Sequence, residues 1–296
     1  MNYKDYEQKL IEELKKINRN ARIIISPVIR NNGEEQAALI ILPEGEICSP
    51  EIFLSSIYGH FCRNHLTVRQ SAEFVMNLYN NIRESMNENC QLEEDLIDFE
   101  KIEDHLTIKI INREWNTKLL EEVVNIPFLD LAGMFYIANS LETMTAGIKV
   151  TRELKTLWGV SLETLLNTAL RNLSLHGHFK MREIREVLSE ISEYRVSHEK
   201  SSTPGLYVVT DISRRNGPAV LLLPEVMKEM ADDLEDDLLF LPSSVNELIV
   251  LRAQHADIPD LKRIVQEIND TVVEKQEILG NGVYRFHRHS SELSVA

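Results

Sequence analysis

The sequence has few cysteines, no long apolar run and no excess of basic charge, and each absence excludes a class of protein. Its three cysteines, Cys48, Cys62 and Cys90, lie far apart and form no C-x-x-C pair, which argues against a disulfide framework or a zinc knuckle. No apolar run approaches the roughly 18 residues of a membrane-spanning helix. The first residues mix charges of both signs in an amphipathic pattern, so we expect no secretory signal. We therefore expect a protein of the reducing cytoplasm with no membrane partner.

The charge balance is strongly acidic. Lys and Arg number 32 against 47 Asp and Glu, which gives a formal net charge of -15. This charge favours solubility and opposes non-specific binding to nucleic acid, so nucleic acid is an unlikely partner. With 296 residues and 43% hydrophobic content, the chain can bury one large core or two medium ones.

The sequence also lacks the motifs of the large enzyme and cofactor-binding classes. It contains no phosphate-binding G-x-x-x-x-G-K-[ST], no dinucleotide-binding G-x-G-x-x-G, no H-E-x-x-H and no G-x-S-x-G. We therefore expect no cofactor, and we assign no catalytic residue.

Several weaker patterns favour a structural interpretation over a chemical one. Ser197–Lys200 matches S-x-x-K, but it lies in a loop-like segment without the companion motifs of serine acyltransferases. The pairs His176/His178 and His287/His289 have no third ligand at metal-binding spacing. The acidic cluster Asp232–Asp237 lacks the arrangement of a calcium loop. We expect surface histidines, a solvated helix end and no metal site.

Helical and strand periodicities alternate irregularly along the chain, which favours an α+β fold with antiparallel hairpins packed against several amphipathic helices. We expect one domain over residues 1–296. The predicted helices begin near Tyr3, Ile52, Val68, Asn116, Ser161, Phe179, Pro224 and Pro259. The predicted strands are Ala21–Arg30, Ala37–Glu44, Leu106–Ile111, Leu206–Thr210, Ala219–Leu223, Leu238–Leu241, Leu248–Leu251 and Gly282–His289.

The helix after Ser161 has the clearest periodicity. Ser161 occupies an N-cap position, and the apolar residues that follow recur at helical spacing. We expect Leu165, Leu166, Ala169 and Leu173 to be buried.

Two assignments and one repeat stay open. Leu129–Ala138 fits either a strand or a buried helix, because periodicity cannot separate them. Glu193–Gly205 has linker composition and would allow a break between two lobes. The segments Asn31–Glu44 and Arg215–Glu225 share an Asn-Gly turn followed by an apolar run and Leu-Pro-Glu. This echo indicates either an internal duplication or the common chemistry of turns and helix entries.

The most informative segment is Asp237–Leu251, in which a Leu-Pro-Ser-Ser break joins two apolar runs. Proline cannot donate to a central ladder, so Pro242 ends the first predicted strand. Polar side chains on such a connection serve either a turn or a ligand. The candidate binding loop comprises Ser243, Ser244, Asn246 and Glu247.

Blocks along nearly the whole chain resemble the bacterial domain of unknown function 5688, found mainly in Firmicutes. They are Ile110–Leu120, Leu157–Leu173, Leu206–Leu222, Phe240–Leu251 and Val283–Phe286. The block around Trp158 is also similar, more distantly, to domain of unknown function 1444. Asn246 and Pro218 stand where the family pattern has histidine and alanine. The resemblance implies a fold and a compartment, but no activity.

The leading functional hypothesis is a cytoplasmic, non-catalytic protein that binds an unknown protein or small molecule, since the clear signals are packing signals. One alternative is a hydrolase or transferase that uses the Pro-Ser-Ser loop with Glu247 and Asp130. Another is a mobile-element or nucleic-acid accessory protein with a small basic face of Lys180, Arg182 and Arg185.

Overall fold

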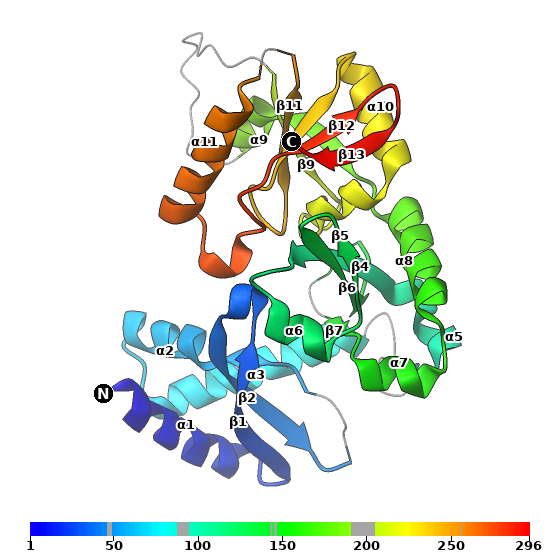
Figure 1. Cartoon of the computed structure of the whole chain (residues 1–296). Coiled ribbons are helices and arrows are strands. Elements are labelled where there is room, and N and C mark those ends of the chain that lie inside the picture. The colour runs from blue at the N-terminus through cyan, green and yellow to red at the C-terminus, as the bar shows by residue number, and fades with distance from the viewer. Residues whose placement is uncertain (46–48, 88–94, 143, 145–146, 191–204, 255) are drawn as a thin grey trace. The chain divides into compact units, whose positions relative to one another are not determined.

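The computed structural model describes residues 1–45, 49–87, 95–142, 144, 147–190, 205–254 and 256–296. The chain divides into two compact units, Met1–Ile102 and Glu103–Ala296, coloured blue to cyan and green to red in Figure 1. Helices are mixed with three sheets, and the strands of the described residues pair antiparallel throughout. The predicted α+β class is confirmed.

The first unit packs helices against a three-stranded sheet in the order β1-β2-β3. The expected N-terminal helix and hairpin are present, and the segment expected as a helix from Ile52 begins with a two-residue strand instead. The core joins Tyr6, Leu10 and Leu14 of the first helix to Leu39 and Ile41 of the hairpin. The elements are α1 Tyr3–Ile17, β1 Ala21–Ile29, β2 Glu35–Pro43, β3 Ile52–Phe53, α2 Leu54–Arg63, α3 Val68–Asn87 and α5 Phe99–Ile102.

The second unit contains a four-stranded sheet built around β6, Leu131–Ala138, which settles the assignment that periodicity left open. β6 pairs with β4, Leu106–Asn112, along its length, and with β5, Asn125–Phe128, and β7, Gly147–Lys149, on its other edge. Because it has neighbours on both edges and is buried at seven of its eight positions, it shows no polar alternation that would mark it as a strand.

The second sheet of this unit has six strands in the order β13-β12-β10-β11-β9-β8. The predicted pair Leu238–Leu241 (β10) and Leu248–Arg252 (β11) lies at its centre, as expected. The remaining strands are β8 Lys180–Glu183, β9 Leu206–Thr210, β12 Tyr284–His287 and β13 Glu292–Val295. The expected final strand is therefore shorter and forms a hairpin with β13.

Helices complete the second unit. They are α6 Thr117–Glu122, α7 Arg152–Trp158, α8 Leu162–His176, α9 Ile184–Glu190, α10 Pro224–Leu234 and α11 Ile258–Thr271. α11 packs Val265 against Leu239 and Leu241 of β10. Figure 1 shows α8 beside β4. The Ser161 hydroxyl accepts a hydrogen bond from the Thr164 amide at 2.9 Å, which confirms the predicted N-cap of α8.

The buried face of α8 is rotated from the predicted one. Leu165, Ala169 and Leu173 are buried as expected, but Leu166 is only partly buried. The polar residues Thr168 and Asn172 are buried instead. Asn172 can be buried because its amide donates to the carbonyls of Glu103 at 2.7 Å and Leu106 at 2.9 Å, which offsets the loss of water.

Two expected elements are different in the structure. Ala219–Leu223, expected as a strand, lies in a 3-10 helix, Gly217–Leu222 (η3), because Pro218 favours the first turn of a helix and the segment is buried all round. Phe179–Ile191, expected as a helix, begins with β8, whose pairing with β9 overrides its helical pattern. The two similar segments therefore differ in structure: Asn31–Glu44 contains the turn and second strand of a hairpin, and Arg215–Glu225 contains a 3-10 helix.

The expected linker lies largely outside the described residues, which exclude 191–204. The strands on either side of it, β8 and β9, pair with each other. The boundary between the two compact units falls between Ile102 and Glu103, and a lobe break within Glu193–Gly205 stays a prediction.

Candidate functional site

A tight turn after β9 carries the polar side chains of the candidate site. Asp211 is buried, and its carboxylate accepts hydrogen bonds from the amides of Ser213 at 3.2 Å, Arg215 at 3.0 Å and Asn216 at 2.8 Å. The Ser213 hydroxyl bonds to the same carboxylate. An aspartate that accepts the amides following it stabilises a sharp reversal of the chain. Asp211 thereby holds Arg215 and Asn216 in place.

The predicted binding loop packs against this turn. The carbonyl oxygen of Asn246 accepts hydrogen bonds from the Gly217 amide at 2.9 Å and from the Thr210 hydroxyl at 3.1 Å. The approach is so close that a Cβ at Gly217 would lie 2.7 Å from the Asn246 oxygen and 2.8 Å from the Val209 oxygen. The loop after β10 is therefore a support for the turn that carries Arg215.

Within the predicted loop, the serine side chains bond to the backbone of the loop itself. The Ser243 hydroxyl donates to the Glu247 carbonyl at 3.0 Å, and the Ser244 hydroxyl accepts from the amides of Asn246 at 3.1 Å and Glu247 at 3.2 Å. Burial of the carboxyl group and the negative charge of Glu277 raise the pKa of Glu247, although the residue as a whole is exposed. A ligand-binding role for this loop stays a prediction.

Lys109 is the most perturbed ionisable group beside the turn. It lies in β4, is partly buried, and holds its Nζ 4.7 Å from the centre of the Tyr136 ring. Burial and the nearby positive charge of Arg215 lower the pKa of Lys109 from its ordinary 10.5 to about 8, and the negative charge of Asp211 opposes the shift. Desolvation and a like charge both disfavour an ammonium ion. Keeping Lys109 charged in the folded protein therefore costs free energy.

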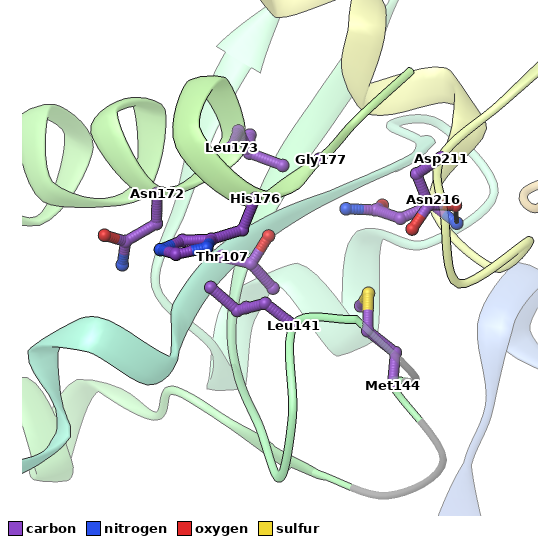
Figure 2. A pocket seen from close by; sticks show the side chains of 9 residues that line it. All are labelled: Thr107, Leu141, Met144, Asn172, Leu173, His176, Gly177, Asp211 and Asn216. Carbon is purple, nitrogen blue, oxygen red and sulfur yellow. Dashed lines mark hydrogen bonds between the residues drawn. The ribbon is translucent and has the colours of Figure 1, made fainter. Parts of the chain in front are cut away.

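A small cavity lies beside β4, where it is lined by Thr107, two residues from Lys109 on the same face of the strand. It leaves about 10 Å³ for the centre of a water-sized molecule, roughly the least that one water needs. Figure 2 shows Asn172, His176 and Thr107 on one side and Asp211 and Asn216 on the other. The lining residues are Thr107, Leu141, Met144, Asn172, Leu173, His176, Gly177, Asp211 and Asn216.

One buried acceptor on this cavity has no partner among the described residues. Asn216 is 2% exposed, and its Nδ2 donates to the Ile108 carbonyl at 2.9 Å. Its Oδ1 is buried and receives no hydrogen bond. An unsatisfied buried acceptor costs about 1 to 3 kcal/mol, so a donor that enters the cavity would be favoured.

The other candidate residues lie apart from this site or take part in structural contacts. His287 and Arg285 contact Asp237, which accounts for part of the acidic cluster, and Asp232 pairs with Lys228 and Arg288. No group of three His, Cys, Asp or Glu that could hold a metal occurs in the described part of the chain. The Ser197–Lys200 motif lies outside it.

Asp130, the partner suggested for the Pro-Ser-Ser loop, lies beside Tyr284. A Cβ at Gly282 would be 3.3 Å from both the Asp130 Oδ2 and the Tyr284 hydroxyl. Burial of the phenol, with the adjacent Asp130 carboxylate, raises the pKa of Tyr284. Asp130 is exposed, whereas Tyr284 of β12 is fully buried.

Lys109, Asp211 and Arg215 were not among the residues predicted from the sequence. A lysine inside the apolar strand Leu106–Asn112 could have indicated a functional position, because lysine is rarely buried unless it is paired. The spacing from Asp211 to Asn216 is typical of a turn in which an aspartate accepts the following amides. Neither signal alone indicates that the two segments meet.

Comparison with known proteins gives a family and no activity. Among the residues that the structure describes, none of the helices has the length and apolar character to cross a membrane. Searches of curated proteins and of solved structures found no match. A model of a family of unknown function, DUF5688, matches residues 3–288. Since this match covers nearly the whole sequence, the chain belongs to the family DUF5688.

Proposed function

We propose that this protein is a cytoplasmic, non-catalytic binding protein that holds a small anionic ligand between Lys109 and Arg215. The observation that carries the proposal is the hydrogen bond from Asn216 Nδ2 to the Ile108 carbonyl at 2.9 Å, which joins β4 to the turn of Arg215, so that the charges of Lys109 and Arg215 act on each other. The carboxylate of Asp211, whose charge also acts on Lys109, accepts hydrogen bonds from the amides of its own turn.

The energetics favour an anion at this position. The positive charge of Arg215 and the loss of water both disfavour the ammonium of Lys109. An anion between the two would offset both costs, because charge-assisted hydrogen bonds contribute about 1.5 to 3 kcal/mol each. Arg215 is exposed, so a ligand can approach from solvent.

The net charge of -15 supports a small ligand over a nucleic acid, because the field of the whole chain opposes a polyanion. The small basic face of Lys180, Arg182 and Arg185 lies on β8 and α9. If that face bound nucleic acid, the protein would be retained on heparin and released steeply with salt.

The hydrolase or transferase alternative receives less support. The Ser243 and Ser244 hydroxyls both bond to the backbone of their own loop, as expected of a structural turn. The exposed free thiol of Cys62 is consistent with a reducing compartment, and the family resemblance supports a bacterial, Firmicute source.

The test is a calorimetric titration with inorganic phosphate and with a small dicarboxylate at pH 7. Lys109→Met and Arg215→Gln should each weaken binding by about tenfold or more, since each removes a charge-assisted contact. Arg214→Gln is the matched control, because it removes the same charge from the same turn. Equal affinities for the parent and both site variants, or no binding at all, would overturn the proposal.

A further inference from the structure

We propose that the edge strand β13 pairs with β13 of a second copy of this chain, so that two molecules form a dimer through one continuous sheet. The unpaired edge of a sheet presents free backbone N–H and C=O groups to which another strand can add. β13, the red strand Glu292–Val295 of Figure 1, ends the order of the six-stranded sheet and pairs with β12. The dimer does not depend on the anion site.

Alternate residues of β13 direct their backbone groups away from β12. The Ala296 amide donates to the Val283 carbonyl at 2.8 Å, so these two residues form a hydrogen-bonded pair of the antiparallel ladder. Such pairs alternate with pairs that share no hydrogen bond, and Leu293 and Val295 therefore point their N–H and C=O groups out of the sheet. Val295 is 47% exposed, and no strand of the described residues pairs with this edge. These groups are available to a further strand.

Other sheet edges carry features that discourage pairing. At the opposite edge of the same sheet, β8 carries Lys180 and Arg182, and charged residues on an edge oppose the addition of a strand. The edge strand β1 contains Pro27, which interrupts a ladder. On β4, the carbonyl of Ile108 already accepts the side-chain amide of Asn216. β13 contains neither proline nor a basic residue.

The sequence of β13 is complementary to itself. With a two-fold axis through Ser294, Leu293 of one copy lies opposite Val295 of the other, and the two residues exchange a pair of backbone hydrogen bonds. The same register places these two apolar side chains side by side across the strands, which favours pairing. The two-fold axis repeats each contact, so one strand supplies both halves of the interface.

Charges are also complementary in this register. Glu292, which is exposed, falls opposite Ala296 of the other copy and therefore on the same face of the sheet. The Nζ of Lys262 in α11 donates to the backbone oxygen of Ala296 at 2.6 Å, so Glu292 approaches Lys262 of the other copy. Within one chain, Glu292 and Ala296 are separated by about 13 Å of extended strand. The ion pair therefore forms between copies and favours a second copy as the occupant of the edge.

Sedimentation equilibrium of the full chain tests the dimer. The strand is short and the interface small, so we expect a dissociation constant on the order of 10 to 100 µM. Val295→Pro removes an outward amide without removing a bond to β12, and it should weaken the dimer by about tenfold or more. Val295→Thr is the matched control, because it keeps the amide and a β-branched side chain and should dimerise about as tightly as the parent. A parent that stays monomeric at about 1 mM, or a dimer unaffected by Val295→Pro, would overturn the proposal.

Exchanging the charges tests the register without a proline. Glu292→Lys and Lys262→Glu should each weaken self-association by about fivefold or more, because each variant places like charges opposite one another twice. When the two variants are mixed, every pair again joins opposite charges, so a heterodimer about as tight as the parent dimer should form. Measurement at about 0.15 M salt limits the general repulsion between the acidic chains to about 8 Å. No recovery of association in the mixture would overturn the two-fold register.

Discussion

Arg285 donates two hydrogen bonds to one carboxylate oxygen of Asp237, from Nε at 3.1 Å and from Nη2 at 2.8 Å. The other carboxylate oxygen accepts the Arg288 amide at 2.9 Å. Asp237 thus joins the entry of β10 to the hairpin of β12 and β13, which makes the acidic cluster after α10 partly structural.

This contact predicts a loss of stability in acid. Burial of the carboxyl would raise the pKa of Asp237, but the Arg288 amide and the Arg285 guanidinium outweigh burial and lower it below 3.8. A depressed carboxyl pKa stabilises the fold above the unfolded pKa, and the effect is lost as the pH falls through the folded pKa. Asp237→Asn should cost no more than about 1 kcal/mol at pH 7, since the ion pair is largely solvated.

Chemical unfolding at pH 7 and pH 3 checks this prediction. The difference between the parent and Asp237→Asn should shrink at pH 3, where the parent carboxyl approaches protonation. A difference that is the same at both pH values would show that charge is not the cause.

Lys109→Met should stabilise the protein at pH 7 while it removes anion binding. The shift of the pKa of Lys109 from 10.5 to about 8 means that keeping the lysine charged in the fold costs about 1 to 3 kcal/mol. This cost is fully present below pH 8 and declines as the pH rises toward 10.5, because the folded lysine loses its proton first.

Urea unfolding at pH 7 and pH 10 measures this cost, with Lys149→Met as the control for adding a methionine to the same sheet. The stabilisation by Lys109→Met should be smaller at pH 10. If Lys109→Met were less stable than the parent at pH 7, the charged lysine would not destabilise the fold, contrary to this prediction.

The rotated face of α8 predicts unequal effects from two adjacent leucines. Leu165 is fully buried, whereas Leu166 is only partly buried. Leu165→Ala should lower the free energy of unfolding by about 2 to 5 kcal/mol through lost burial and a cavity, and Leu166→Ala should lower it by about 1 kcal/mol. Equal losses of stability for the two variants in urea unfolding would show that Leu166 is as buried as Leu165, as periodicity predicts.

Alanine substitutions at two glycines should change the stability of the fold in opposite directions. A methyl group at Gly217 would clash with the backbone of Asn246 and Val209, so Gly217→Ala should open the turn at a cost of about 1 to 3 kcal/mol. At Gly59 of α2, the nearest atom to the new methyl group would be the flexible end of Arg63 at 3.7 Å, and alanine should stabilise the helix by about 0.5 to 1 kcal/mol.

Hydrogen exchange in the intact chain checks the prediction for Gly217. Gly217→Ala should accelerate exchange of the amides from Ser213 to Gly217, and phosphate binding should weaken with it. Unchanged exchange in this turn would show that the backbone accommodates the methyl group without loss.

The sequence by itself determined the family, the α+β class and most of the local elements. The N-cap at Ser161, the proline that ends β10 and the hairpin of β1 and β2 are set by neighbouring residues, so local patterns suffice to predict them. The loop of Ser243–Glu247 was also found from sequence, although the structure makes it a support for the turn after β9.

Only the tertiary structure decided which ambiguous segments became strands and where the candidate site lies. β6 is a strand because it has neighbours on both edges, and α8 buries Asn172 because distant carbonyls accept its amide. Ile108 and Asn216 are 108 residues apart and meet through one hydrogen bond, which joins the strand of Lys109 to the turn of Arg215. Contacts of this kind form when two packed surfaces exclude water, and no local periodicity encodes them.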